Sequence, residues 1–249
     1  MYKIVLIRHG ESEWNKTGQF TGWVDVDLSS VGLKQSQEAG LLLKKEKLSF
    51  DLAYASFLKR TVKTLDIILD KMDLSWLPVK KDWRLNEKHY GSLQGLNKKE
   101  VAKKFGTEQV LLWRRSYDFC PPAVKSSSPY NQMKDRRYNF LKKPILTESL
   151  KDVETRIISF WQEEIIPQLK KNKKILIVAS GNSLRALLKY TNNISPEKII
   201  DLNIPVAVPM VLELDNKFKT KKWYYLGNAK KISALIKNVV DQSKLKNKK

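Results

Sequence analysis

The sequence predicts a single α/β domain with a mostly parallel central sheet flanked by helices. Segments with strand character alternate with helical patterns, which is the order found in parallel sheets with crossover helices. One segment, KILIVA at residues 174–179, is a continuous apolar run typical of a strand covered on both faces. The chain has 249 residues and no internal repeat or linker, so we expect one domain over residues 1–249.

Apolar periodicity and end signals place the elements along the chain. The expected strands lie at residues 3–8, 52–56, 174–179, 209–214 and 223–226. The expected helices lie at residues 32–46, 58–71, 98–105, 150–170 and 195–202. A cap signal, Ser29-Ser30, precedes the first helix, and a proline assists the start of the last.

Polar sequence directly follows three of the four main strands. These segments are Arg8-His9-Gly10, Ser56 with Lys59-Arg60, and Ser180-Gly181-Asn182. In open α/β sheets the functional groups gather beyond the carboxyl ends of the strands. We therefore expect these three segments to meet in one site.

Two segments fall outside the alternating pattern. Residues 121–146 are irregular and rich in Ser, Pro and Lys, which predicts a surface insertion over one edge of the sheet. Residues 243–249 form a basic tail, which we expect to be flexible. This tail is either a frayed terminus or a flap that closes over an anionic ligand.

The net charge of +21 favours anionic partners, whether a phosphorylated metabolite, a nucleic acid or a membrane surface. Nine of the 47 basic residues are arginines, and these fall mostly beside other unusual residues, whereas the lysines are spread along the chain. Guanidinium groups bind phosphate and carboxylate oxygens in a bidentate way that lysine cannot copy. A nucleic-acid-binding protein is the rival interpretation. It rests on charge alone, because the chain lacks zinc ligands, an aromatic-basic RNA signature and helix-turn-helix spacing. We therefore expect neither a nucleic acid nor a membrane as partner.

Cysteine count and hydropathy bear on the compartment. A single cysteine, Cys120, excludes an internal disulfide and a cysteine-based metal cluster. The sequence begins with a strand pattern in place of a signal peptide, and no apolar run approaches the roughly 18 residues needed to span a bilayer. We expect a soluble, cytoplasmic protein.

The strongest chemical signal is LIRHGESEWN at residues 6–15. A neutral imidazole attacks phosphorus if its other nitrogen donates a hydrogen bond that fixes the tautomer. Gly10 lets the backbone approach a ligand, and Arg8 can neutralise phosphoryl oxygens. We interpret His9 as the nucleophile of a phosphoryl-transfer site.

Further motifs extend this signal along the chain. They are FTGWVDVDLS at 20–29, SFLKRT at 56–61, WRLNEKHYGSLQGLNK at 83–98, WRRSYD at 113–118, ESLKD at 148–152 and GNSLRAL at 181–187. Together with LIRHGESEWN they resemble the 2,3-bisphosphoglycerate-dependent phosphoglycerate mutases of the histidine phosphatase superfamily. The match is nearly collinear from residue 2 to about residue 246.

The resemblance implies a role for each matching position. His9 would carry the phosphoryl group, and Glu87 would exchange a proton with the substrate hydroxyl. The positions that would bind phosphate or substrate are Arg8, Asn15, Thr21, Gly22, Arg60, Tyr90, Lys98, Arg114, Arg115, Gly181 and Asn182. His89, the other histidine, is interpreted as structural.

The resemblance also implies the reaction and the partners. The chain would interconvert 3-phosphoglycerate and 2-phosphoglycerate in glycolysis and gluconeogenesis. The priming phosphoryl donor would be 2,3-bisphosphoglycerate, and no metal is expected. The oligomer would be a homodimer or a dimer of dimers.

The sequence departs from the family at Ser180, where the family has a second catalytic histidine that donates to the phosphoryl group. A serine hydroxyl donates one neutral hydrogen bond, and losing a preorganised donor costs about 10²–10³ in rate. Three explanations stay open: a slowed mutase, a decayed paralogue that binds phosphoglycerates without efficient turnover, or an engineered substitution. Slow bisphosphoglycerate phosphatase activity is a minor option.

Two smaller departures accompany Ser180. Ala207 stands where the family usually has glycine, which removes backbone freedom if that position needs a positive φ. Lys88 replaces the arginine that usually follows the catalytic glutamate, which we regard as a mild change.

Overall fold

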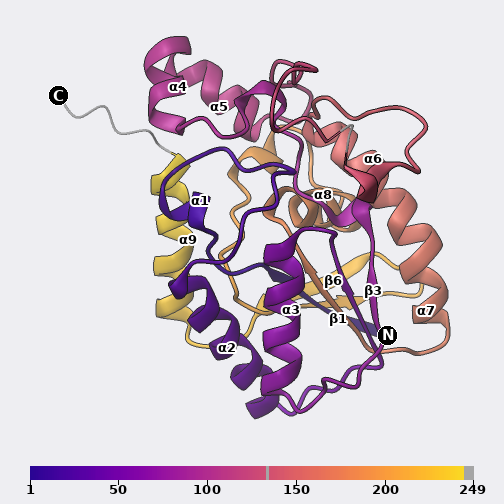
Figure 1. Cartoon of the computed structure of the whole chain (residues 1–249). Coiled ribbons are helices and arrows are strands. Elements are labelled where there is room, and N and C mark those ends of the chain that lie inside the picture. Colours follow the sequence, from indigo (N-terminus) through magenta and orange to yellow (C-terminus); the bar gives the residue numbers. More distant parts are fainter. Residues whose placement is uncertain (133–134, 244–249) are drawn as a thin grey trace.

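A six-stranded sheet forms the centre of the molecule in this computed structural model, which describes residues 1–132 and 135–243 (Figure 1). The order across the sheet is β3-β2-β4-β1-β5-β6. In chain order the strands are β1 (Tyr2–Arg8), β2 (Leu52–Ala55), β3 (Val79–Lys81), β4 (Ile175–Ala179), β5 (Met210–Leu214) and β6 (Thr220–Tyr225).

The first four strands of that order run parallel, and β5 and β6 continue the sheet in antiparallel fashion. Arg8 of β1 pairs with Ala179 of β4, so the carboxyl ends of these two strands are level. Ala55, the last residue of β2, pairs with Val178 of β4. The polar segments after β1, β2 and β4 therefore leave the sheet at the same edge.

Helices cover both faces of the sheet. The α-helices are α1 (Glu13–Lys16), α2 (Ser30–Lys45), α3 (Lys59–Lys71), α4 (Lys98–Phe105), α5 (Thr107–Arg115), α6 (Leu150–Phe160), α7 (Ile166–Lys170), α8 (Gly181–Asn192) and α9 (Ala229–Ser243). Short 3₁₀ turns are η1 (Trp83–Leu85), η2 (Gly91–Leu93), η4 (Arg136–Tyr138) and η6 (Lys198–Asp201), and η5 (Trp161–Ile165) is a π-turn.

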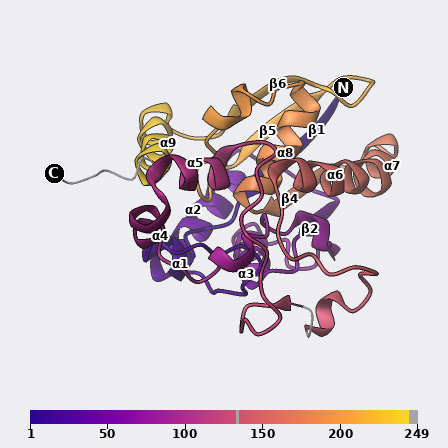
Figure 2. The same ribbon diagram turned by 90° about the horizontal axis from the view of Figure 1, so that it is seen from above.

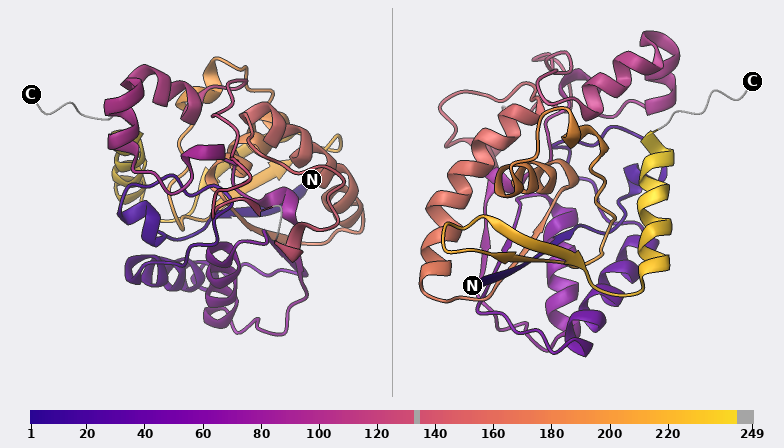
Figure 3. Two further views of the ribbon diagram at one scale, coloured as in Figure 1. Left: turned by 45° about the horizontal axis from the view of Figure 1, so that its top comes forward. Right: turned by 180° about the vertical axis from the view of Figure 1, so that it is seen from behind.

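Alternation along β1 divides the core into two parts, because successive side chains of a strand point to opposite faces. Ile4 and Leu6 pack with residues of α6 and α8, whereas Val5 and Ile7 pack with residues of α2 and α3. The left view of Figure 3 shows the indigo-to-purple helices α2 and α3 side by side on their face. In the right view, the yellow helix α9 lies beside α2, and Lys231 pairs with Glu38 at 2.9 Å between them.

The predicted fold class is confirmed, since this is one α/β domain with a mostly parallel sheet. The five expected strands are present, with small differences at their ends. The sequence reading missed β3, whose three residues are exposed and are held by pairing with β2 alone. It also missed α1, α5, α8 and α9. Only Ser180 separates the end of β4 from the start of α8. The sequence Ser-Gly-Asn-Ser at this junction is typical of a turn, so it hides the start of the helix.

Two expected helices differ from the prediction. The helix expected at 195–202 is reduced to the 3₁₀ turn η6. The helix expected at 150–170 is one rod in Figure 2, but a π-turn at Trp161–Ile165 divides it into α6 and α7. Pro167, the second residue of α7, has no N–H to donate, so the ordinary hydrogen-bond ladder is interrupted at this point.

The described residues of the 121–146 segment lie mostly on the surface and contain the 3₁₀ turn η4. Side-chain contacts that attach this segment to the rest of the molecule include the following two. The Tyr138 hydroxyl accepts from Asn86 Nδ2 at 2.9 Å, and Arg137 Nη1 contacts Asp25 Oδ2 at 2.7 Å. Of the expected basic tail, Ser243 is the last residue of α9, and residues 244–249 lie outside the described part.

Ala207 adopts a left-handed backbone conformation, with φ at 51°. A residue with a Cβ pays about 1–2 kcal/mol for this conformation, whereas glycine adopts it freely. The Ala207 N–H donates to the Arg8 carbonyl at 2.8 Å. The segment before β5 is therefore strained at the point where it binds the end of β1.

Candidate active site

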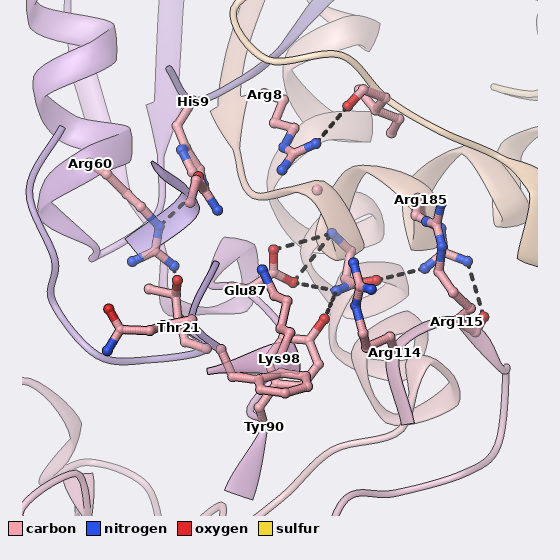
Figure 4. Close-up of a pocket in the computed structure, with 17 residues that line it drawn as sticks. Arg8, His9, Thr21, Arg60, Glu87, Tyr90, Lys98, Arg114, Arg115 and Arg185 are labelled. Carbon is pink, nitrogen blue, oxygen red and sulfur yellow. Dashed lines mark hydrogen bonds between the residues drawn. The ribbon is translucent and has the colours of Figure 1, made fainter. Parts of the chain in front are cut away.

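A pocket opens beyond the carboxyl ends of β1, β2 and β4, as the polar strand ends predict. All predicted site residues except Ser180 line it: Arg8, His9, Asn15, Thr21, Gly22, Arg60, Glu87, Tyr90, Lys98, Arg114, Arg115, Gly181 and Asn182. Figure 4 shows His9 and Arg60 on one side, Arg114, Arg115 and Arg185 on the other, and Glu87 between them.

The His9 ring is buried and held at both nitrogens. Nδ1 lies 2.7 Å from the Gly10 carbonyl, and Nε2 lies 3.2 Å from Nε of Arg60. A carbonyl can only accept and a guanidinium can only donate, so Nδ1 carries the proton and Nε2 keeps its lone pair. Burial, and then the charges of Arg60 and Arg8, hold the pKa of His9 well below its ordinary value of 6.5. His9 is therefore a neutral imidazole whose Nε2 electron pair faces the Arg60 N–H.

Arg60 comes from the first turn of α3 and is 1% exposed. Its two Nη atoms donate to the Gly22 carbonyl at 2.8 Å and the Val24 carbonyl at 3.0 Å. Gly22 has φ at 55°, and a Cβ there would lie 2.2 Å from Gln94 Oε1. The loop thus needs glycine at position 22 in order to wrap around the guanidinium.

Arg8 ends β1, and its Nη1 donates to the Ile204 carbonyl at 2.8 Å. Its Nε is buried and has no hydrogen-bond partner within the described chain. The Thr21 hydroxyl, also in the pocket wall, is buried and unbonded in the same way. Buried polar groups usually find partners, so these two groups indicate a site built for a ligand with acceptor atoms.

The Glu87 carboxylate receives three N–H groups at the start of α8 and in its own loop. Nδ2 of Asn182 donates to Oε1 at 2.7 Å, and the Asn182 backbone N–H lies 3.3 Å from the same oxygen. The Lys88 backbone N–H donates to it at 2.7 Å. Asn182 Nδ2 also contacts the Tyr90 hydroxyl at 3.1 Å, so one amide links Glu87 to Tyr90.

Lys98, Arg114 and Arg115 form the far wall of the pocket, from the start of α4 and the end of α5. Burial, and then the charges of Arg114 and Arg8, lower the pKa of Lys98 to about 7. Burial and the neighbouring guanidinium groups lower the pKa of Arg115 to about 9. These cations destabilise one another when the pocket holds no anion, so a bound anion relieves their repulsion.

Ser180 is fully buried and does not line the pocket, in contrast to the other predicted site residues. It occupies the N-cap position of α8, yet its hydroxyl makes no capping bond and has no partner within the described chain. The neighbouring Gly181 does line the pocket, and a Cβ there would lie 3.3 Å from Arg8 Nε. The serine side chain at position 180 is therefore buried and does not reach the pocket surface.

The sequence reading did not assign four further lining residues, which are Gln19, Phe20, Arg185 and Ile204. Arg185 lies three residues after Asn182 on α8, a spacing that places both on one helix face. That spacing, combined with the scarcity of arginine, was the signal available in the sequence.

The two residues after Glu87 do not line the pocket. Lys88 is fully buried, and its Nζ donates to the Trp113 carbonyl at 2.6 Å, just before Arg114. His89 is also buried. Its Nδ1 accepts from the Gly91 N–H at 3.0 Å, and its Nε2 lies 2.6 Å from Gln132 Oε1. Lys88 contacts the last turn of α5, and His89 contacts the 121–146 segment.

Comparison with known proteins identifies the family. The model of the histidine phosphatase superfamily (branch 1) matches residues 4–145 and 127–226. The 2,3-bisphosphoglycerate-dependent phosphoglycerate mutase of Elusimicrobium minutum is 51% identical over 99% of this chain and 100% of its own length. Those of Porphyromonas gingivalis and Borrelia garinii are 52% identical over the same shares. This chain belongs to the 2,3-bisphosphoglycerate-dependent phosphoglycerate mutase family.

Solved structures of more distant relatives share the fold of this mutase-family chain. The mycobacterial glucosyl-3-phosphoglycerate phosphatase superposes with a TM-score of 0.70 at 22% identity, covering 92% of this chain and 100% of that one. The Bacillus stearothermophilus protein YhfR gives 0.68 at 20% identity, covering 88% and 94%. At such identities the likeness concerns the fold alone.

The described residues contain no group of three or more His, Cys, Asp or Glu side chains that could hold a metal ion. They also include no helix with the length and apolar character needed to cross a bilayer.

The lowered pKa of Lys98 predicts that anion binding takes up a proton. At pH 8 Lys98 is mostly neutral in the free protein, because its pKa is about 7. A bound anion favours the charged form, so the pKa rises and Lys98 binds up to about one proton. At pH 6 Lys98 is already protonated, and this uptake disappears. Calorimetric titration with sulfate in two buffers of different ionisation enthalpy measures it.

The matched variants for this experiment are Lys98→Met and Lys103→Met. The first removes the titrating group, whereas the second removes a 75% exposed lysine one turn along α4 and leaves the uptake unchanged. Equal binding enthalpies in both buffers at pH 8 would contradict the prediction.

Proposed function

We propose that this chain interconverts 3-phosphoglycerate and 2-phosphoglycerate through a phosphohistidine at His9, with 2,3-bisphosphoglycerate as the priming donor. Membership of the mutase family supports the reaction. The observation that carries the assignment to His9 is its pair of contacts, Nδ1–H to Gly10 and Nε2 toward Arg60. These contacts leave the attacking electron pair on the nitrogen that faces the guanidinium.

In the priming step the Nε2 lone pair of His9 attacks one phosphorus of 2,3-bisphosphoglycerate. The N–P bond forms as the bond from phosphorus to the substrate oxygen breaks, and the electron pair stays on that oxygen. Arg60 Nε, now in contact with Nε2, and the unbonded Arg8 Nε would donate to the phosphoryl oxygens. Fixed cationic donors of this kind stabilise charge that develops in the transition state.

Glu87 supplies the proton that the leaving oxygen needs. Its carboxyl group gives up a proton as the substrate oxygen departs, which leaves a phosphohistidine, a carboxylate and a monophosphoglycerate. The free hydroxyl of a monophosphoglycerate then attacks the phosphohistidine, so the N–P bond breaks, a new P–O bond forms, Glu87 takes the hydroxyl proton back and 2,3-bisphosphoglycerate results. His9 next attacks the other phosphate of this bisphosphate, with Glu87 again supplying the proton, so the isomeric monophosphoglycerate leaves and His9 is phosphorylated for the next turnover.

The far wall supports a scheme in which either phosphate of the bisphosphate can be presented to His9. Lys98, Arg114 and Arg115 offer several cationic donors, and the lining residues include one carboxylate, Glu87, among those that the structure describes. Such a wall can hold a carboxylate or a phosphate in more than one orientation. The same donors, with the unbonded groups of Arg8 and Thr21, suit 2,3-bisphosphoglycerate, which carries three anionic groups. No metal is needed in this scheme.

Ser180 is proposed to slow the reaction. Its hydroxyl is buried and unbonded and does not line the pocket, so it is a poor replacement for an imidazole that donates to the phosphoryl group. The alternative is a chain that binds phosphoglycerates without efficient turnover. The intact contacts of His9 and Glu87 favour the slow enzyme.

The phosphohistidine is tested by intact-mass measurement after incubation with 2,3-bisphosphoglycerate. We expect an acid-labile phosphate adduct that is absent in His9→Ala. His89→Gln is the matched control, because it removes the only other histidine of the sequence and leaves His9 in place. If no adduct forms under any condition, His9 is not the acceptor.

Ser180→His tests the cause of slow turnover. An imidazole at this position restores a charge-assisted donor, so mutase turnover in an enolase-coupled assay should rise at least about tenfold. Ser180→Ala removes the hydroxyl and should lower turnover by less than about tenfold, since the group donates no bond in the free protein. A Ser180→His variant that folds with unchanged turnover would show that Ser180 is not the limiting defect.

We also propose a homodimer or a dimer of dimers in the cytoplasm. The open edge of the sheet supports this, because the residues of β3 are exposed and Trp76 beside it is 74% exposed. Exposed edges and large aromatic side chains are typical of contact surfaces. Light scattering should give two or four times the 28.9 kDa of the chain, and a particle of single-chain mass at micromolar concentration would contradict it.

A further inference from the structure

Arg185 is a buried cation that the mechanism above does not use. It is 3% exposed and lies on α8, one turn after Asn182. Its Nη1 donates to Asn182 Oδ1 at 2.7 Å. Its Nη2 donates to the Ile199 carbonyl at 2.7 Å and the Arg115 carbonyl at 3.1 Å. We propose that Arg185 is a positioning residue that fixes the side-chain amide of Asn182 so that its NH₂ group faces Glu87; this deepens the proposed function and rests on it.

The argument starts from hydrogen-bond polarity. A primary amide has one accepting end and one donating end, and the two can be exchanged by a half-turn of the side chain. A guanidinium has five donors and no acceptor, so it tolerates only the accepting end. Because Arg185 holds Oδ1, the NH₂ group of Asn182 must point the other way.

The orientation of the Asn182 amide matters because its NH₂ end faces Glu87 and Tyr90. Nδ2 lies 2.7 Å from Glu87 Oε1 and 3.1 Å from the Tyr90 hydroxyl. If the amide turned over, Oδ1 would face the carboxylate at this distance, and two acceptors would repel each other. Glu87 would then lose one of its three N–H donors and move from the place where it exchanges the proton.

The electrostatic setting of Arg185 supports a positioning role. Its hydrogen-bond acceptors are one amide and two backbone carbonyls, not a carboxylate, and its Nε is buried without a bond in the described part of the chain. Burial lowers its pKa to about 10, so it remains charged at neutral pH. A buried charge without an ion pair is expensive. Glu87 is the acidic group whose charge acts on Arg185 in compensation, and Asn182 lies between the two.

The Nη2 atom of Arg185 contacts the substrate-binding wall. By donating to the Arg115 carbonyl, Nη2 holds the last residue of α5. Lys88 holds the preceding turn through the Trp113 carbonyl at 2.6 Å. Lysine at position 185 could donate to Asn182, but a single ammonium group cannot span all three acceptors in the same geometry.

The first test observes Asn182 directly and needs no activity. Side-chain amide signals are recorded by NMR with ¹⁵N-asparagine labelling, and those of Asn182 are assigned by their loss in Asn182→Asp. In the unaltered chain we expect hydrogen-bonded, slowly exchanging amide protons. Arg185→Met should abolish this pattern, and Arg185→Lys should retain it. Lys189→Met, which removes another largely buried cation one turn along α8, is the matched control and should leave it unchanged.

The second test is a double-mutant cycle on mutase turnover, in the unaltered chain and in the Ser180→His background. Arg185→Met should lower kcat about 10–100-fold with a small change in KM, and Arg185→Lys should recover most of the loss. If Arg185 acts through Asn182, then Arg185→Met in the Asn182→Ala background should change kcat by less than about threefold.

Three results would overturn the proposal. They are unchanged Asn182 signals in Arg185→Met, additive effects of the two substitutions, or a rise in KM at constant kcat, which would make Arg185 a plain binding residue. If Arg185→Met does not fold, Arg185→Gln carries the same measurements. Absence of turnover in every background would defeat the proposed function, whereas the amide signals would still decide the role of Arg185.

Discussion

The site depends on one constraint, which is that six cationic side chains are held close together in one pocket. Arg8, Arg60, Lys98, Arg114, Arg115 and Arg185 line one pocket, with Glu87 as the carboxylate among the described lining residues. Burial lowers the pKa values of these cations, and the charges of neighbouring cations lower them further for Arg60, Lys98, Arg114, Arg115 and Arg185. Backbone carbonyls hold several of them in place, since Arg8, Arg60 and Arg185 each donate to at least one. A carbonyl orients a guanidinium without neutralising it, so the charge stays available to an anion.

The same constraint explains the buried pair behind the pocket. Arg156 and Glu148 form a bidentate ion pair, at 2.7 and 3.0 Å, in which both side chains are nearly inaccessible. Arg156 also donates to the Glu87 carbonyl at 3.1 Å, and Glu148 accepts the His89 N–H at 2.8 Å. This pair fixes the backbone on both sides of Lys88. The cations that line the pocket stay available to an anion. The charges of Arg156 and Glu148 behind the pocket neutralise each other.

Much of the fold and the site could be predicted from the sequence, because both rest on local patterns. Apolar runs gave the five strands, and the polar residues after β1, β2 and β4 gave the location of the site. What the sequence could not give depends on tertiary contacts. Strand β3 has no apolar pattern and exists through its pairing with β2. The link from Arg185 to Asn182 and Glu87 depends on how α8 approaches the loop at 86–98. The recessed position of Ser180 depends on where the side chain leaves the β4–α8 junction, which residue order does not reveal.

The start of α8 also has a consequence for the chemistry. Ser180 stands at the N-cap but makes no capping bond, and the Asn182 backbone N–H instead approaches the Glu87 carboxylate. An acid from a distant segment thus takes the place of the missing local cap and meets the positive end of the helix dipole. When that acid accepts a proton, the helix loses its negative end group. The charge of Glu87 therefore governs both the proton exchange with the substrate and the stability of the first turn of α8.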